Sequence, residues 1–161
     1  MSSAAVTPSA PPASDRLVGE ALSKSAMLWI RTPERTWPVW HAHSEGRAYV
    51  VCGPGEQSLP DPLPEVVELV LRAKDSRARL LTVPAMTHRV RPESPEWEPA
   101  ATALQSARLN SPVAHHDLPQ HWAEHARVLA LVPDTAQAEV GAAGEEGSGA
   151  APPPPSGATT R

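Results

Sequence analysis

The sequence predicts a mainly β domain with accessory helices, in which six antiparallel strands form a small barrel. Strand-like runs of β-branched and aromatic residues follow one another through short connections, and no long crossover separates the first five runs. Both ends of the chain are rich in Ala, Pro, Gly and Ser with scarcely a large apolar side chain, which predicts disorder there. We therefore expect a disordered tail over residues 1–14, one barrel domain over residues 15–133 and a second disordered tail over residues 134–161.

The domain is predicted to begin with a helix and a strand. Ser14 and Asp15 are suitable N-cap residues for a short helix over residues 16–23, where apolar side chains recur at helical spacing. Residues 26–31, AMLWIR, are apolar on both faces until the arginine, which is typical of a strand covered on both sides.

A β-hairpin is predicted over residues 37–52. Its first arm alternates up to a polar turn at residues 44–46, and RAYVVC, residues 47–52, forms the second arm. In the first arm, the side chains of Val39, His41 and His43 should share one face, and those of Trp40 and Ala42 the other.

The segment after the hairpin predicts two more strands. Residues 58–64 contain three prolines and form a crossing loop, because proline cannot sit inside a central strand or a helix. Residues 65–72 and 79–90 are the strands, and Pro84 should mark a bulge or an edge in the second of them.

Two helices and a strand complete the predicted domain. Ser94 and Pro95 open a helix that runs to Asn110, since serine caps helices well and proline suits the first helical position. A shorter helix is expected over residues 118–126 with Trp122 as its buried anchor, followed by a strand over residues 128–132.

Composition limits the classes of partner. The formal net charge is −4, and much of it lies in the C-terminal tail, which contains four acidic residues and one arginine. A basic stripe is absent, so nucleic acid is not expected as a partner. Neither a membrane-span pattern nor a signal-peptide pattern is present, and the single Cys52 cannot form a disulfide within the chain, so we expect a cytoplasmic protein without membrane contact.

The segment GPGEQ, residues 53–57, is the candidate ligand loop. Gly53 and Gly55 can adopt positive φ angles or admit a ligand close to the backbone, and Pro54 fixes the φ angle between them. A rigid glycine loop at the end of a strand suits a ligand site, and it suits a structural corner equally well.

Seven histidines raise the question of a metal. His41 and His43 share a strand face, and His121 and His125 share a helix face. Tetrahedral zinc needs three or four converging ligands, and tryptophan follows His121 where a zincin motif requires glutamate. We therefore predict no metal site, and a haem- or metal-binding barrel stays as an alternative function.

The order of strands resembles the flavin-binding split β-barrel family typified by pyridoxamine phosphate oxidase, and small actinobacterial members most of all. The matching features are the pair AMLWIR and PVWHAHS, the strand RAYVV leading into a loop, the strands EVVELVLR and RARLLTVPAMTHRV, and a helix that opens near Ser-Pro-Glu. The resemblance covers about residues 24–132. It implies a six-stranded split β-barrel that forms a homodimer, binds FMN or a deazaflavin in a groove between subunits, and acts, if it is an enzyme, as an oxidoreductase in hydride transfer.

The resemblance also implies which residues lie near the cofactor. The flavin ring would lie against the second and third strands, and the loop after them would meet the ribityl or phosphate end. The sequence does not identify a general acid, and His41 is the nearest candidate. The ring-side residues would be Trp40, His41, Val51, Cys52 and Gly53, and those near the other end Gly55, Glu56 and Gln57.

The chain departs from the family in this loop. Members that hold FMN tightly have Arg or Lys after the third strand, where a cation meets the phosphate, whereas this chain has Glu56 and Gln57. Arg72 and Lys74, two residues apart at a strand end, are the substitute cations, unless they are solvated turn residues. The alternative function is therefore a cofactor-free barrel that serves as a binding or interaction module.

Overall fold

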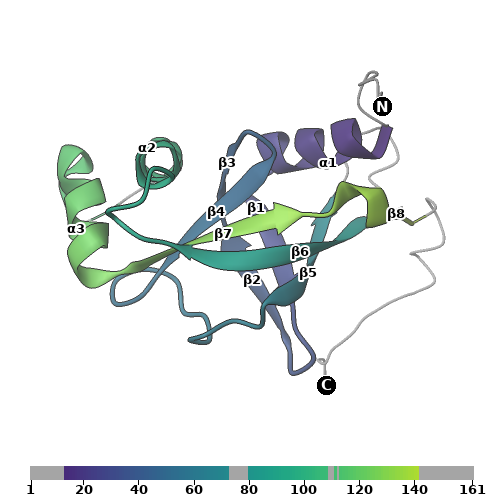
Figure 1. The fold of residues 1–161 in the computed structure, drawn as a ribbon, viewed down its shortest axis with the longest axis horizontal. Helices are drawn as coiled ribbons and strands as arrows, with labels where there is room; N and C mark the ends of the chain where they lie inside the picture. The colour runs from purple at the N-terminus through teal and green to yellow at the C-terminus, as the bar shows by residue number, and fades with distance from the viewer. Residues whose placement is uncertain (1–12, 73–79, 109–110, 112, 142–161) are drawn as a thin grey trace, which may run out of the picture.

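The structure, a computed structural model, describes residues 13–72, 80–108, 111 and 113–141. Over these residues the chain forms a curled antiparallel sheet, with α2 and α3 together at one side of it and α1 at another (Figure 1). The helices are α1 (Ala13–Lys24), α2 (Trp97–Ala107) and α3 (Leu118–His125), with short 3₁₀ turns at η1 (His115–Asp117) and η2 (Thr135–Gln137). The strands are β1 (Met27–Arg31), β2 (Thr36–Trp40), β3 (Ala42–Ser44), β4 (Arg47–Cys52), β5 (Val66–Arg72), β6 (Leu80–Val90), β7 (Arg127–Pro133) and β8 (Glu139–Val140).

The sheet is curled, so that its two edge strands lie next to each other in the chain with one residue between them. Its strand order is β2-β1-β5-β6-β7-β4-β3, and β8 pairs with β6. The first and last strands of that order, β2 and β3, are consecutive in the chain and are separated only by His41. The mainly β fold with accessory helices is therefore confirmed, in the form of an open, curled antiparallel sheet.

The predicted count of six strands is corrected to eight over the described residues, because β8 follows β7 and because the first arm of the predicted hairpin is two strands. β2 pairs with β1, whereas β3 pairs with β4, so the pairing partner changes at His41. The hairpin itself is real for β3 and β4, where Glu45 and Gly46 have φ angles of 52° and 79°, as a two-residue turn between twisted strands requires. Side chains continue to alternate between the two sides of the sheet through His41 without a break. The sequence pattern therefore could not reveal that the pairing partner changes there.

Two clusters of buried side chains stabilise the sheet from its two sides. The inner cluster fills the curl and includes Leu22 of α1 together with Ile30 and Leu69 of the sheet. The outer cluster lies between β3, β4 and β7 and the helices α2 and α3, where Trp122 is fully buried as predicted. Burial of such apolar surface is the main stabilising term for a domain of this size.

The outer side of β1, β5 and β6, which we call the open face, carries large apolar side chains in contact with solvent. Met27 and Trp29 are exposed on β1, and Val66 and Met86, directly opposite each other on β5 and β6, are 56% and 55% exposed. These exposed apolar side chains form two groups on the open face, with the Arg31–Glu68 ion pair between them.

The structure continues past residue 133, where the sequence placed the start of the C-terminal tail. The strand β8 pairs with β6, and the Thr135 hydroxyl donates a hydrogen bond to the Asp15 carboxylate of α1. Pro84 lies in β6 where the neighbour changes from β8 to β7, and its carbonyl accepts from the amide of Asp134, 2.8 Å away. The N–H that proline lacks would point to this same gap, so no ladder hydrogen bond is lost. Residues 1–12 and 142–161, which the predicted tails include, lie outside the described residues.

None of the helices in the described segments combines the length and the apolar character that a membrane-spanning helix needs.

Candidate functional site

The GPGEQ loop forms a tight corner directly after β4. Gly53 has a φ angle of 132°, and a Cβ atom there would lie 3.2 Å from Cα of Ala126, so both conformation and space require glycine. The amide of Gly53 donates to the carbonyl of Gln57, and the amide of Glu56 donates to the carbonyl of Gly53, each over 2.9 Å. The loop therefore turns its next two side chains, Glu56 and Gln57, back toward the protein.

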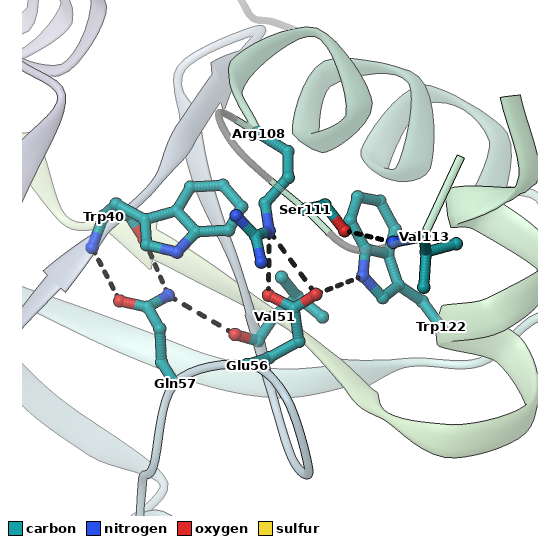
Figure 2. Close-up of polar contacts among 8 residues, drawn as sticks. All are labelled: Trp40, Val51, Glu56, Gln57, Arg108, Ser111, Val113 and Trp122. Atoms are coloured by element: carbon teal, nitrogen blue, oxygen red, sulfur yellow. Dashed lines mark hydrogen bonds and ion pairs between the residues drawn. The ribbon is translucent and has the colours of Figure 1, made fainter. Parts of the chain in front are cut away.

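The edge strands β2 and β3 do not pair with each other, and we call the place between them the split in the sheet. The side chain of Gln57 connects the end of β2 to β4 across this split (Figure 2). The amide N–H of Trp40 donates to Oε1 of Gln57 over 2.7 Å, and Nε2 of Gln57 donates to the carbonyls of Trp40 and Val51 over 3.0 and 3.3 Å. The carboxamide thus satisfies backbone groups that a neighbouring strand would otherwise satisfy.

The carboxylate of Glu56 is buried in an ion pair. Its side chain is 3% exposed and accepts from Nε of Arg108, which is 14% exposed, over 3.1 Å. Its second oxygen accepts from Nε1 of Trp122 over 3.0 Å. Glu56 therefore joins the β4 loop to the end of α2 and to α3, and its charge is matched inside the protein.

Trp40 lies on the outer side of the sheet, at the border between the part that α2 and α3 cover and the open face. Its ring packs against the outer cluster, and the guanidinium carbon of Arg108 is 5.8 Å from the ring centroid. Arg108 thus reaches from the end of α2 to lie between the Trp40 ring and Glu56 (Figure 2). On its other side, Trp40 pairs directly with the exposed Met27 of β1. We call Trp40, Glu56, Gln57 and Arg108 the Trp40 site.

The other residues that the resemblance implied lie in several places. Val51 is buried in the outer cluster beside the Trp40 site, and Gly55 is exposed at the tip of the loop with a φ angle of 79°. Cys52 faces the inner cluster, and burial raises the pKa of its thiol. His41 is also buried, on the side of α1, which makes it a poor general acid for a ligand at Trp40. Lys74 lies outside the described residues.

Arg72 ends β5 on the open face, on the same side of the sheet as Trp40. Trp29 pairs with Val70, and Met27 pairs with Trp40, so a row runs from Trp40 through Met27 toward the end of β5. Trp40 and the end of β5 are two strand spacings apart, which is about 10 Å. Sequence reasoning did not identify Arg108, because its partner Glu56 is 52 residues away along the chain; a basic residue at a helix end was the only local signal.

A second polar cluster fixes the start of α2 to the sheet. Glu96, the residue before α2, accepts hydrogen bonds from Arg47 over 2.6 Å, from the Tyr49 hydroxyl over 2.8 Å and from His88 over 2.7 Å. Tyr49 and His88 both pair with Ala130, whose small side chain leaves room for the carboxylate between them. These four groups line a surface pocket of about 600 Å³, and their hydrogen bonds satisfy one another.

The pKa values of this cluster follow from its hydrogen bonds. Burial and the hydrogen bond to Glu96 raise the pKa of Tyr49 to about 12. Burial alone would raise the pKa of Glu96, but the hydrogen bonds from His88, Tyr49 and Arg47 outweigh it and hold that pKa below 4.5.

We expect the Glu96 cluster to make stability sensitive to acid. Because the folded-state pKa of Glu96 is below its ordinary value of 4.5, ionised Glu96 stabilises the fold above pH 4.5, and this contribution is lost as pH falls through the folded-state pKa. Urea denaturation of the wild type and of Glu96→Gln, at pH values on both sides of 4.5, should give a difference in unfolding free energy that shrinks toward low pH. A difference that stays constant with pH would contradict this assignment.

The described residues hold no group of three or more His, Cys, Asp or Glu side chains placed to bind one metal ion. His121 and His125 lie together on α3 with ring centroids 4.9 Å apart, and both remain at the surface side of the helix without a third ligand of that group.

Comparison with known proteins identifies the fold. No family model matches the chain, and no curated protein shows significant similarity to it. Among solved structures, a candidate pyridoxamine 5′-phosphate oxidase from Listeria innocua superposes with a TM-score of 0.50 at 12% identity, over 79% of this chain and 96% of that one. An F420 reductase (TM-score 0.48, 14% identity, 81% and 98% covered) and the haem storage protein HutZ from Vibrio cholerae (TM-score 0.45, 10% identity, 67% and 80% covered) also match. The resemblance that the strand order predicted, to split-barrel proteins of the pyridoxamine phosphate oxidase type, is therefore confirmed as a likeness of fold.

Proposed function

We propose that this protein binds FMN or a deazaflavin in a groove between two copies of the chain, with the cofactor ring against Trp40. The observation that carries the proposal is the place of Trp40, whose ring borders the open face on one side and the Arg108 guanidinium on the other. An aromatic platform beside a fixed cation is suited to a flat, electron-accepting ring that becomes more negative when it is reduced. The fold shared with a candidate pyridoxamine 5′-phosphate oxidase supports the choice of ligand class.

The residues fit the two ends of such a ligand unequally. Trp40 and Met27 offer a ring-binding surface, whereas Glu56 and Gln57, expected near the phosphate, are occupied by Arg108 and by backbone groups. A phosphate at this loop would have to displace a buried carboxylate from its ion pair, which is unfavourable. We therefore assign the phosphate end to Arg72, at the far end of the row that begins at Trp40.

A second copy of the chain is the proposed cover of the open face. The face is apolar at Trp29, Val66 and Met86, and the charges of its Arg31–Glu68 ion pair balance. A self-complementary patch of this character suits a two-fold interface. The groove would then lie where the edge of this interface meets Trp40.

A bound flavin or deazaflavin would supply hydride transfer, so the protein would be an oxidoreductase. The protein's own residues would orient the ring through Trp40 and place the Arg108 cation beside it. The Glu56 carboxylate fixes that cation in turn, through the ion pair at 3.1 Å.

Fluorescence titration tests the cofactor directly. We expect FMN or a 5-deazaflavin to be quenched on binding to the wild type, and Trp40→Leu to bind it about tenfold more weakly. Trp37→Leu is the matched control, because Trp37 lies on the same strand but packs against the inner cluster. Equal loss in both variants would point to a general effect on the fold, and no binding of either compound by the wild type would reject the proposal.

Sedimentation tests the dimer separately. Trp29→Glu should convert a dimer to a monomer and weaken cofactor binding, whereas Val140→Glu, at an exposed apolar position on β8, should change neither. A dimer that binds neither cofactor would instead favour the cofactor-free interaction module, which the occupied Glu56 and Gln57 side chains make the second candidate.

A further inference from the structure

His41, the single residue between β2 and β3, has one ring nitrogen without a partner. Its side chain is 4% exposed, and Nε2 lies 2.8 Å from the carbonyl oxygen of Leu22 in α1. A carbonyl can only accept, so Nε2 carries the proton and Nδ1 presents a bare lone pair. This Nδ1 is buried and finds no hydrogen-bond partner in the described structure. A buried lone pair of this kind requires an explanation.

His43 presents a second unpartnered nitrogen close by. It lies two residues further along the chain, and it pairs with Ala48, a residue of the inner cluster. Its Nε2 is buried without a hydrogen-bond partner, and at a spacing of two residues its side chain lies on the same face of the chain as that of His41. A neutral imidazole nitrogen with a bare lone pair is the form that binds metals.

We propose that Nδ1 of His41 and Nε2 of His43 form a two-coordinate site for a soft monovalent metal ion, Cu(I). Two neutral nitrogen donors satisfy a d¹⁰ monovalent ion, whereas zinc needs three or four ligands, and the described residues provide no third His, Cys, Asp or Glu to this pair. The hydrogen bond from His41 to the Leu22 carbonyl is the outer contact that orients a metal-binding imidazole and fixes its tautomer.

A cavity lies three residues along the chain from His43 and would give the ion a path toward the site. A cavity of about 350 Å³ opens between α1 and the β3–β4 turn, and it is lined by Val18, Gly19 and Gly46 among others. A Cβ atom at Gly19 or at Gly46 would meet nothing within 4 Å, so this space is open. His43, the less buried of the two histidines, is three residues from Gly46 on this side of the sheet.

Anaerobic titration with Cu(I), in competition with a colorimetric chelator, tests the site in the flavin-free full-length protein. The wild type should bind one ion per chain, and His43→Gln should weaken that binding by at least about 100-fold while circular dichroism shows an unchanged fold. His41→Gln should also lose the ion, since its amide can still donate to Leu22 but offers no second nitrogen donor.

Two control variants decide between this site and its competitors. His121→Gln/His125→Gln removes the surface histidine pair of α3, and Cys52→Ala removes the only thiol of the chain. Both should keep the wild-type affinity, and X-ray absorption of the loaded protein should show two nitrogen ligands and no sulfur. The proposal is overturned if the wild type binds no Cu(I), if His43→Gln binds as tightly as the wild type, or if Cys52→Ala abolishes binding. Because flavin is absent from these experiments, their outcome is independent of the proposed cofactor.

Discussion

Replacement of Glu56 by alanine is expected to lower the free energy of unfolding by about 3–5 kcal/mol. The substitution leaves Arg108, 14% exposed, without the carboxylate that matches its charge, and it removes the acceptor of the buried Trp122 indole N–H. The penalty arises from the buried groups that lose this partner, more than from the lost attraction itself. Urea denaturation at neutral pH, followed by circular dichroism, measures the change.

Two other carboxylate variants serve as controls for Glu56→Ala. Glu56→Gln keeps an acceptor for Trp122 and should cost less than the alanine variant. Glu68→Gln breaks the ion pair with Arg31, where both side chains are well exposed, and should cost about 1 kcal/mol or less. If Glu56→Ala cost no more than Glu68→Gln, the buried ion pair would not hold α2 and α3 to the loop.

Leu22→Ala is expected to cost about 2–5 kcal/mol, the second large effect. Leu22 is 1% exposed, and it packs in the inner cluster where α1 closes the curled sheet. Its truncation leaves a cavity that the surrounding strands cannot fill, because β-sheet cores relax only in part. Chemical denaturation gives the cost, and hydrogen exchange of the α1 amides shows whether the helix has loosened.

Leu17→Ala on the same helix is the matched comparison. Leu17 is only partly buried at the edge of the inner cluster, and its truncation should cost clearly less than that of Leu22. Equal costs at the two positions would mean that α1 does not insert into the curl as described.

The local pattern of apolar and polar residues predicted the strands well, because the two faces of a strand lie in different environments. Residues 47–52 and 65–72 have the period and the β-branched content that such surfaces require, and both form strands at nearly the predicted bounds. Alternation also placed Trp40 and Ala42 on one shared face, and both contact the outer cluster. What alternation cannot encode is which strand lies alongside, and so the change of partner at His41 was missed.

The chemistry of the GPGEQ loop shows the same limit for a site. The carboxylate of Glu56 indicated a poor phosphate position, but the local sequence could not show which groups the carboxylate contacts instead. Its partners, Arg108 and Trp122, follow 52 and 66 residues later and approach only after α2 and α3 pack on the sheet. Likewise, the role of Gln57 requires the backbone of Trp40 to be unpaired at the split, which is a property of the curled sheet.

The helix α2 is anchored by charge at both of its ends, by Glu96 at its start and Arg108 at its close. At 1.5 Å per residue these anchors are about 18 Å apart, one at the Tyr49 pocket and the other beside Trp40. Because α2 is held at both ends, it can neither slide along the sheet nor rotate about its axis without breaking one of these two contacts. Protonation of Glu96 would release only the first of these two contacts, and α2 would then be held to the sheet by the Arg108–Glu56 ion pair and by its buried apolar side chains.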